Sequence, residues 1–287
     1  MAGDDVRFDS LFPPEMAARA EQVGVRKAHL DAVSTFALAV LAGAFIALGA
    51  IFATTVSAGG GALPFGIVRL VAGLAFSLGL ILVIVGGAEL FTGNTLIVMA
   101  WASRKVSTRL VLRNWAIVYI GNFVGAVGTA FVVFAGGQYT FGNGSVGLAA
   151  LATGNAKAGL DFVPALALGM LCNALVCLAV WLTFSARTTT DRILAIVPPI
   201  AAFVAAGFEH SVANMFFIPV ALLIRAFAPA SFWTEVGRTA ADYPNLTMYD
   251  FLAGNLLPVT IGNIIGGALM VGIVYWFIYL RTSRRAT

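Results

Sequence analysis

Long apolar runs, separated by short polar segments, recur along the chain, and six of them are long enough to cross a lipid bilayer. A membrane-spanning helix needs about 20 predominantly apolar residues. The six runs extend approximately over Val33 to Val56, Phe65 to Trp101, Trp115 to Gly136, Phe162 to Phe184, Ile193 to Phe227 and Leu252 to Leu280. This pattern predicts an all-α membrane protein with six transmembrane helices.

The second and fifth runs are too long and too often interrupted to be single straight helices. The second contains the segment VGGAELFTGN near its middle, and the fifth contains Pro198 and Pro199 followed by AGFEHSVAN. Glycine and proline can interrupt a membrane helix where the freed backbone groups are buried in protein or line a cavity. We therefore predict that the second and fifth helices are broken.

The two interrupted runs also match each other. GAELFTGN carries Glu89 and Asn94, and GFEHSVAN carries Glu209 and Asn214, so that the pattern G-x-E-x-x-x-x-N occurs twice, 120 residues apart. A second pair, YIGNFVGA and TIGNIIGG, follows in the same order at a separation of 141 residues. The chain therefore contains a repeat of three spans. An odd number of spans forces the two copies into opposite orientations in the membrane.

Inverted repeats with paired broken helices indicate a pore or binding site near the membrane midplane. The repeat also divides the chain. Residues 1–30 form an N-terminal segment with a short helix, residues 31–281 form the six-helix domain with halves at about 31–136 and 160–281, and residues 282–287 form a tail.

Composition and charge agree with this assignment. Of the residues, 60% are hydrophobic and 10% are charged, whereas a soluble domain carries about 25% charged residues. Thirteen Lys and Arg residues fall in the two terminal segments and in the loops that share their side of the membrane, against three in the opposite loops. Cytoplasmic loops are rich in Lys and Arg, which places both termini in the cytoplasm. Because this bias explains the net charge of +4, we expect no nucleic-acid partner.

Three acid or imidazole groups lie at membrane depth: Glu89, Glu209 and His210. A charged group at a helix centre costs about 2.5–3.5 kcal/mol on insertion scales. Because the glutamates match in the two repeats, we expect them to accept hydrogen bonds from backbone N–H groups freed at the breaks. Structural roles at the breaks are predicted for four residues: Glu89, Glu209, Asn94 and Asn214. His210 corresponds to Leu90 in the first half, and we therefore expect His210 to face a pore.

Enzymatic chemistry finds no support in the sequence. The two glutamates lie in separate, symmetric repeats, and no metal-ligand spacing such as H-E-x-x-H occurs. No nucleophile is paired with a base. We therefore expect neither a catalytic site nor a metal ion nor a cofactor.

Four segments carry a resemblance to a known family. FSLGLILVIVGGAELFTGN, LCNALVCLAVW, GFEHSVANMFFIP and LLPVTIGNIIGGALMVGIVYW resemble the formate/nitrite transporter family, most of all its formate channel branch, and the likeness runs from about Phe8 to Arg281. The resemblance implies a homopentamer in the bacterial inner membrane. Each protomer would carry its own pore in an aquaporin-like fold whose second and fifth helices are discontinuous.

The resemblance also assigns apolar residues to the pore. It implies that Phe76 and Phe203 form two hydrophobic constrictions, one on each side of the central site. Leu80 and Leu90 would help to form the narrow section. The alternative for both phenylalanines is ordinary core packing, which is the usual role of aromatic residues in membrane helices.

Four polar pore residues follow from the same resemblance. Thr92, in the loop of the broken second helix, would hydrogen-bond with His210. Asn173 would line the pore on the fourth helix, and its alternative role is to bridge helices, as amides in membranes often do. Lys157 would draw anions toward the vestibule opposite the termini, and its alternative is a solvated loop lysine.

For a small carboxylate crossing such a pore, the free-energy barrier is lowest when the carboxylate is protonated to the neutral acid. A bare ion in a low-dielectric slit costs up to tens of kcal/mol, whereas protonating a carboxylate with a pKa near 4 at neutral pH costs about 4 kcal/mol. His210 suits the role of proton donor because imidazole titrates close to neutral pH. A further hypothesis from the resemblance is that the N-terminal helix reduces flux at low pH.

Several alternatives remain open at this point. Nitrite, hydrosulfide or lactate would use similar pore parts, and the sequence favours formate only through the closeness of the resemblance. A neutral-solute pore of the aquaporin type also uses inverted half-helices. That class carries paired Asn-Pro-Ala motifs and a filter arginine, and this chain has neither motif.

Overall fold

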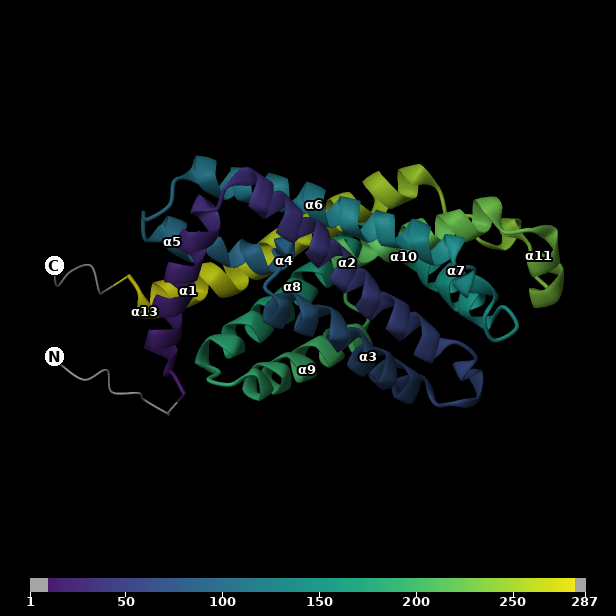
Figure 1. The fold of residues 1–287 in the computed structure, drawn as a ribbon, viewed down its shortest axis with the longest axis horizontal. Helices are drawn as coiled ribbons and strands as arrows, with labels where there is room; N and C mark the ends of the chain where they lie inside the picture. Colours follow the sequence, from purple (N-terminus) through teal and green to yellow (C-terminus); the bar gives the residue numbers. More distant parts are fainter. Residues whose placement is uncertain (1–9, 282–287) are drawn as a thin grey trace.

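The computed structural model describes residues 10–281, and within that range six helical segments are long and apolar enough to cross a membrane (Figure 1). Five are the helices α2 (Ala32–Ser57), α3 (Phe65–Gly86), α6 (Thr108–Ala135), α8 (Phe162–Ser185) and α9 (Thr189–Ala206). The sixth, Asp250–Tyr279, consists of η5 (Asp250–Leu256), α12 (Leu257–Ile264), η6 (Ile265–Ile273) and α13 (Val274–Tyr279). The predicted all-α, six-span fold is confirmed, and the chain is a multi-pass membrane protein.

Shorter helices fill the space between these spans. They are α1 (Pro13–His29), α4 (Phe91–Asn94), η2 (Thr95–Ile97), α5 (Val98–Ala102), α7 (Ser145–Ala158), α10 (Ser211–Phe227) and α11 (Ala230–Val236), with short 3₁₀ turns η1 (Gly60–Ala62), η3 (Gln138–Thr140) and η4 (Ala240–Asp242). Residues 1–9 and the predicted tail, residues 282–287, lie outside the described residues.

Both predicted breaks are present, and each begins at a glycine in the left-handed region. α3 ends at Gly86 and is followed by Gly87 at φ 81°, and α9 ends at Ala206 and is followed by Gly207 at φ 79°. Glycine adopts this conformation without a Cβ clash and is the usual residue after a helix C-terminus. Three further residues follow each glycine before the chain re-enters helix, at α4 and at α10.

Within each half, the three spans pack so closely that their backbones touch at glycine residues. α2 packs against α3 and α6 in the first half, and α8 packs against α9 and α12 in the second. A Cβ on Gly125 would lie 2.0 Å from the carbonyl oxygen of Val40, and a Cβ on Gly266 would lie 2.1 Å from that of Met170. The two glycines are 141 residues apart. Small residues let membrane helices approach closely, and the repeat preserves this contact in both halves.

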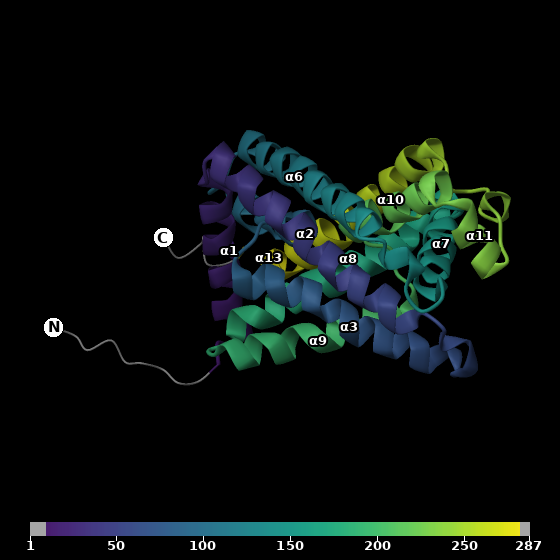
Figure 2. The same ribbon diagram turned by 45° about the vertical axis from the view of Figure 1, so that its right-hand side comes forward.

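The repeat extends further than the sequence indicated, because α1 and α7 are also counterparts. Each precedes the first span of its half, and each carries a lysine near its C-terminal end, Lys27 and Lys157. α1 lies at one end of the molecule beside α5 and α13 (Figure 1). α7 lies toward the other end beside α11 (Figure 2). The alternative for Lys157, a solvated loop lysine, does not apply, because Lys157 is on helix α7 and is paired with Glu209.

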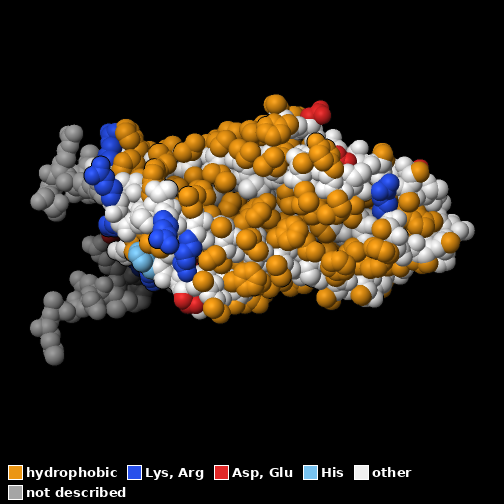
Figure 3. Space-filling view, turned by 90° about the horizontal axis from the view of Figure 1, so that it is seen from above, with side chains coloured by type: hydrophobic (Ala, Val, Ile, Leu, Met, Phe, Trp, Pro, Cys, Tyr) orange, Lys and Arg blue, Asp and Glu red, His pale blue; other side chains and the backbone are white. Residues whose placement is uncertain are grey.

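The surface suits a membrane environment. Apolar side chains cover most of the length of the face seen in Figure 3, and basic side chains gather mainly at the α1 end. Among the exposed apolar residues are Leu48 and Phe52 on α2, Leu74 on α3, and Val124 and Phe131 on α6. Exposed apolar area of this extent marks contact with lipid or with another protein surface.

Candidate pore

The first break is held by a network of four side chains. Glu89 accepts hydrogen bonds from Lys27 Nζ at 2.8 Å and from Asn94 Nδ2 at 2.6 Å. Asn94 Nδ2 also donates to Asn114 Oδ1 at 2.9 Å, and Asn114 Nδ2 donates to the backbone carbonyl of Lys27 at 3.1 Å. The network therefore joins α1, α6 and the break itself.

The second break repeats this network almost atom for atom. Glu209 accepts from Lys157 Nζ at 2.7 Å and from Asn214 Nδ2 at 2.6 Å. Asn214 Nδ2 donates to Asn255 Oδ1 at 2.7 Å, and Asn255 Nδ2 donates to the carbonyl of Lys157 at 2.8 Å. The glutamates lie at the breaks as expected, but the expectation about their donors is wrong. Lysine and asparagine side chains take that place in both breaks.

A second pair of asparagines forms hydrogen bonds with the backbone N–H and C=O groups that the breaks leave without helical partners. Asn122 Oδ1 accepts from the backbone N–H of Phe91 at 2.9 Å, and its Nδ2 donates to the carbonyl of Glu89 at 3.0 Å. Asn263 makes the equivalent bonds in the second half, beginning with the N–H of Ser211 at 2.9 Å. These are the asparagines of the repeated YIGN and TIGN motifs. The motif recurs because each break needs one such asparagine to bind its freed backbone groups.

His210 lies where the two breaks meet. Its Nδ1 accepts a hydrogen bond from the backbone N–H of Ala213 at 3.0 Å and so caps the N-terminus of α10. Its Nε2 lies 3.0 Å from Thr92 Oγ1, which is the contact that the resemblance implied. Because Nδ1 is an acceptor, the proton of the neutral ring is on Nε2, and Nε2 donates to the threonine oxygen. The ring is 2% exposed.

Two cavities approach this centre from opposite ends of the molecule. The α1-side cavity has a volume of about 370 Å³, and Leu80 and Leu90 contribute to its walls. The α7-side cavity has a volume of about 80 Å³ and is lined in part by Phe76, Phe203 and His210. Within residues 10–281 the two cavities share no lining residue. Phe76 and Leu80 are one turn apart on α3, so about 6 Å along that helix separates the two apolar walls.

The two phenylalanines form one constriction rather than two. Their ring centroids are 5.6 Å apart in an edge-to-face arrangement, and both rings lie on the α7 side. The Phe203 ring also stacks beside His210, with centroids 6.0 Å apart. The expectation that Phe76 and Phe203 lie on opposite sides of the centre is therefore wrong. Leu80 and Leu90 form the wall on the other side.

Asn173 occupies the helix-bridging position that the sequence left as its alternative. Its Nδ2 donates to the carbonyl of Asn263 at 2.6 Å, and it lies 3.2 Å from both the Thr92 carbonyl and Thr95 Oγ1. The side chain is fully buried and lines neither the α1-side nor the α7-side cavity. Asn173 thus fixes the backbone position of Thr92 from behind.

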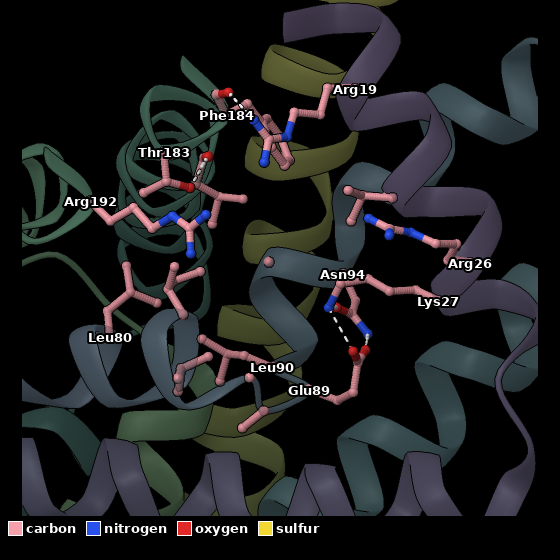
Figure 4. Close-up of a pocket in the computed structure, with 17 residues that line it drawn as sticks. Arg19, Arg26, Lys27, Leu80, Glu89, Leu90, Asn94, Thr183, Phe184 and Arg192 are labelled. Atoms are coloured by element: carbon pink, nitrogen blue, oxygen red, sulfur yellow. Dashed lines mark hydrogen bonds and ion pairs between the residues drawn. The ribbon is translucent and has the colours of Figure 1, made fainter. Parts of the chain in front are cut away.

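The charged groups differ between the cavities. On the α7 side, Lys157 lines the cavity but is paired with Glu209, and Arg69 lies nearby, bonded to the carbonyls of Val204 and Ala205 at the end of α9. On the α1 side, four basic residues and the carboxylate of Glu89 contribute to the lining (Figure 4). The basic residues are Arg19, Arg26, Lys27 and Arg192.

Sequence reasoning missed Lys27, Asn114, Asn255 and Arg69. A signal for the two asparagines was present, since NWAIVYIGN and NLLPVTIGN both begin with asparagine eight positions before the motif asparagine. Arg69 is a lone charge inside an apolar span, which by itself marks a functional or structural partner. The distance from α1 to the first break could not be read from the sequence.

Comparison with known proteins agrees with this geometry. The family model described as formate/nitrite transporter matches residues 14–277. The chain is 48% identical over 279 residues to "Formate channel FocA" of Escherichia coli, covering 97% of this chain and 98% of the relative. It is 42% identical to "Formate channel FocA" of Haemophilus influenzae, covering 95% and 97% of the two chains.

Solved structures give the same result. One described as "Pentameric formate channel with formate bound" superposes with a TM-score of 0.83 at 47% identity, covering 87% of this chain and 98% of the other. Another, described as "FNT family ion channel", has a TM-score of 0.78 at 29% identity, covering 92% and 98%. The chain therefore belongs to the formate/nitrite transporter family.

Proposed function

We propose that this protein is a formate channel that assembles as a homopentamer with one pore per protomer. The proposal places it in a bacterial inner membrane with both termini, and hence the α1-side cavity, facing the cytoplasm. The names of its relatives support formate as the substrate and support the pentamer. The observation that carries the mechanism is the Nε2–H of His210 at the junction of both breaks, between an apolar phenylalanine pair and an apolar leucine pair.

The apolar walls make the neutral acid the cheaper form in the narrow section. Leu80, Leu90, Phe76 and Phe203 offer no hydrogen bond to an anion that has lost its water. Leaving formate charged there costs up to tens of kcal/mol, whereas protonating it at neutral pH costs about 4 kcal/mol. His210 is the titratable group that lies beside this section.

The hydrogen bonds of His210 define how it can act. At rest, the neutral ring donates from Nε2, and an incoming formate oxygen replaces Thr92 Oγ1 as the acceptor. Full proton transfer requires the imidazolium: a second proton, taken from water in the α7-side cavity that His210 lines, binds Nδ1, and the bond from the N–H of Ala213 is lost. The Nε2 proton then passes to the formate oxygen and leaves a neutral ring with its proton on Nδ1. Loss of such a helix cap costs about 1 kcal/mol. A charge on a residue that is 2% exposed also loses most of its hydration. Because an adjacent anion compensates for both losses, His210 becomes charged only while the anion is next to it.

Lys157 and Arg69 both line the α7-side cavity, and together they attract anions to it. Lys157 is largely neutralised by Glu209, so on its own it contributes little field at the cavity. Arg69 lines the same cavity and adds a positive charge whose bonds go to neutral carbonyls. We assign to this pair the role that the sequence suggested for Lys157 alone.

Uptake of labelled formate into proteoliposomes tests the proposal. Flux above that of empty liposomes, reduced more by unlabelled formate than by equal concentrations of nitrite or hydrosulfide, is the expected result. Stronger competition by nitrite or hydrosulfide would assign a different anion of the same family. Flux no higher than that of empty liposomes, or glycerol flux in its place, would refute an anion channel.

A further inference from the structure

The α1-side cavity holds more positive charge than the channel mechanism uses. Lys27 is paired with Glu89, and Arg19 donates from Nη1 to the carbonyl of Phe184 at 3.0 Å. The side chains of Arg26 and Arg192 make no hydrogen bond or ion pair with any residue between 10 and 281 that the structure describes. Two unpartnered guanidinium groups therefore line one cavity, and both are directed into it from different sides (Figure 4).

Arg19 lies close enough to both of these groups for their positive charges to act on it. Burial lowers the pKa of Arg19, and the neighbouring guanidinium groups of Arg192, Arg187 and Arg26 lower it further. The cavity carries one carboxylate, Glu89, whose oxygens are occupied by Lys27 and Asn94. An anion bound between the arginines would relieve this repulsion, and nothing within the described lining does so.

The shape of the cavity favours an anion larger than formate. Its volume is about 370 Å³, which leaves most of the space empty when a single formate is present. A guanidinium presents a planar fork that matches the two oxygens of a carboxylate. Arg26 is on α1 and Arg192 is on α9, and the two groups enter the cavity from different sides (Figure 4). This arrangement suits an anion that carries a carboxylate at each end, one for each guanidinium.

Such an anion cannot continue through the pore. The cavity ends at Leu80 and Leu90, which are each 2% exposed. A dianion would have to lose the hydration of two charges there, and a single imidazole can supply only one proton. It would therefore bind and stop.

We propose that the α1-side cavity is a binding site for small dicarboxylates, held between Arg26 and Arg192, and that an occupied cavity blocks formate flux from that side. The binding stands on the cavity alone, and the block rests on the proposed channel function. The proposal makes the protein sensitive to dicarboxylates on the side that α1 faces.

Formate flux in membrane vesicles of defined orientation tests the block, with succinate as the probe at pH 7.5 and constant ionic strength. Succinate on the α1 side should reduce flux in a saturable manner, and methanesulfonate, a monovalent control, should not. Arg26→Gln or Arg192→Gln should raise the half-inhibitory succinate concentration about tenfold, the effect of losing one charge-assisted contact. Because the readout is the ratio of flux with and without succinate, changes in basal flux cancel.

Arg109→Gln is the matched control. Arg109 is exposed near the start of α6 and is not part of the cavity lining, so this substitution should leave inhibition by succinate unchanged. Inhibition of equal strength from both faces, or inhibition that Arg26→Gln and Arg192→Gln leave intact, would overturn the proposal.

Titration calorimetry on the purified protein separates the site from the channel function. Wild type should bind succinate with saturation even if formate flux is absent, Arg192→Gln should lose at least about tenfold in affinity, and Arg192→Lys should recover part of it because the charge remains. Absence of saturable heat with wild type, or equal affinity in Arg192→Gln, would refute the site without bearing on formate transport.

Discussion

The two helix breaks share one scaffold and differ in what it supports. Each break places a glutamate between a lysine and an asparagine, and each is closed by a further asparagine. In the first break, Asn94 Oδ1 also accepts from Lys27 Nζ at 2.9 Å. In the second, Asn214 Oδ1 is buried without a hydrogen-bond partner. The first network is therefore complete, whereas the second retains an unused acceptor.

The larger difference is the residue after each glutamate. His210 caps α10, which then runs for 17 residues without a change of helix type. Leu90 in the matching position has no capping side chain, and α4 lasts 4 residues before a 3₁₀ turn and α5 follow. Short 3₁₀ segments inside a helix often mark a functional hinge. The symmetric contacts hold both breaks in place, and the departures from symmetry provide the site.

The largest expected effect comes from removing either glutamate. Glu209→Ala leaves the ammonium of Lys157 buried without its partner, which costs about 3–5 kcal/mol. Glu89→Ala should cost less, because the side chain of Lys27 is 28% exposed and that of Lys157 is 18% exposed. Thermal unfolding in detergent measures the difference as a larger fall in Tm for Glu209→Ala.

Glu21→Ala is the control for that comparison. Glu21 pairs with Lys105, whose side chain is 55% exposed and regains water when the glutamate is removed, so the loss should be about 1 kcal/mol or less. Equal losses of Tm for all three variants would show that the ion pairs at the breaks contribute no more to stability than a surface ion pair.

The next effect isolates the cap at the start of α10. His210→Phe removes the acceptor for the N–H of Ala213 and should cost about 1 kcal/mol. His210→Asn keeps a side chain that caps well and should stay within about 0.5 kcal/mol of wild type. Denaturant unfolding separates the two variants, and an order reversed from this one would contradict the tautomer assigned to His210.

A smaller effect concerns the contact between the breaks. Thr92→Val keeps the shape of the side chain but removes the acceptor for the Nε2–H of His210. A hydrogen bond of this kind contributes about 0.5–1.5 kcal/mol, so formate flux should change by about tenfold at most. Thr92→Ser should behave like wild type in the same uptake assay. Equal flux in the valine and serine variants would remove Thr92 from the mechanism.

The sequence predicted the features that depend on composition and local pattern. Six spans, two breaks and the inverted repeat follow from apolar length, glycine and the recurrence of Glu89 and Glu209. The side of the pore on which Phe203 lies depends on the rotation of α9 after two prolines, which no local pattern determines. The partner of Glu89 is Lys27 on α1, 62 residues away along the chain. No local sequence pattern indicates a contact over that separation, so the pairing is visible only in the folded structure.

The same limit explains the error about Asn173. An amide on an apolar helix can face a pore or bridge two helices, and the sequence is identical in both cases. In the structure the Nδ2 of Asn173 donates to the carbonyls of Asn263 and Thr92, so the amide bridges helices and does not face the pore.

The pH dependence of formate uptake by His210→Asn tests the proposed mechanism most directly. Because asparagine keeps the cap but cannot titrate, the flux that remains after subtraction of empty-liposome flux should be independent of pH between pH 5 and 8, whereas wild-type flux should vary. The matched variant Leu90→Asn, at the equivalent position of the other break, should retain the wild-type pH profile. A His210→Asn profile that follows wild type would contradict the role of the imidazole.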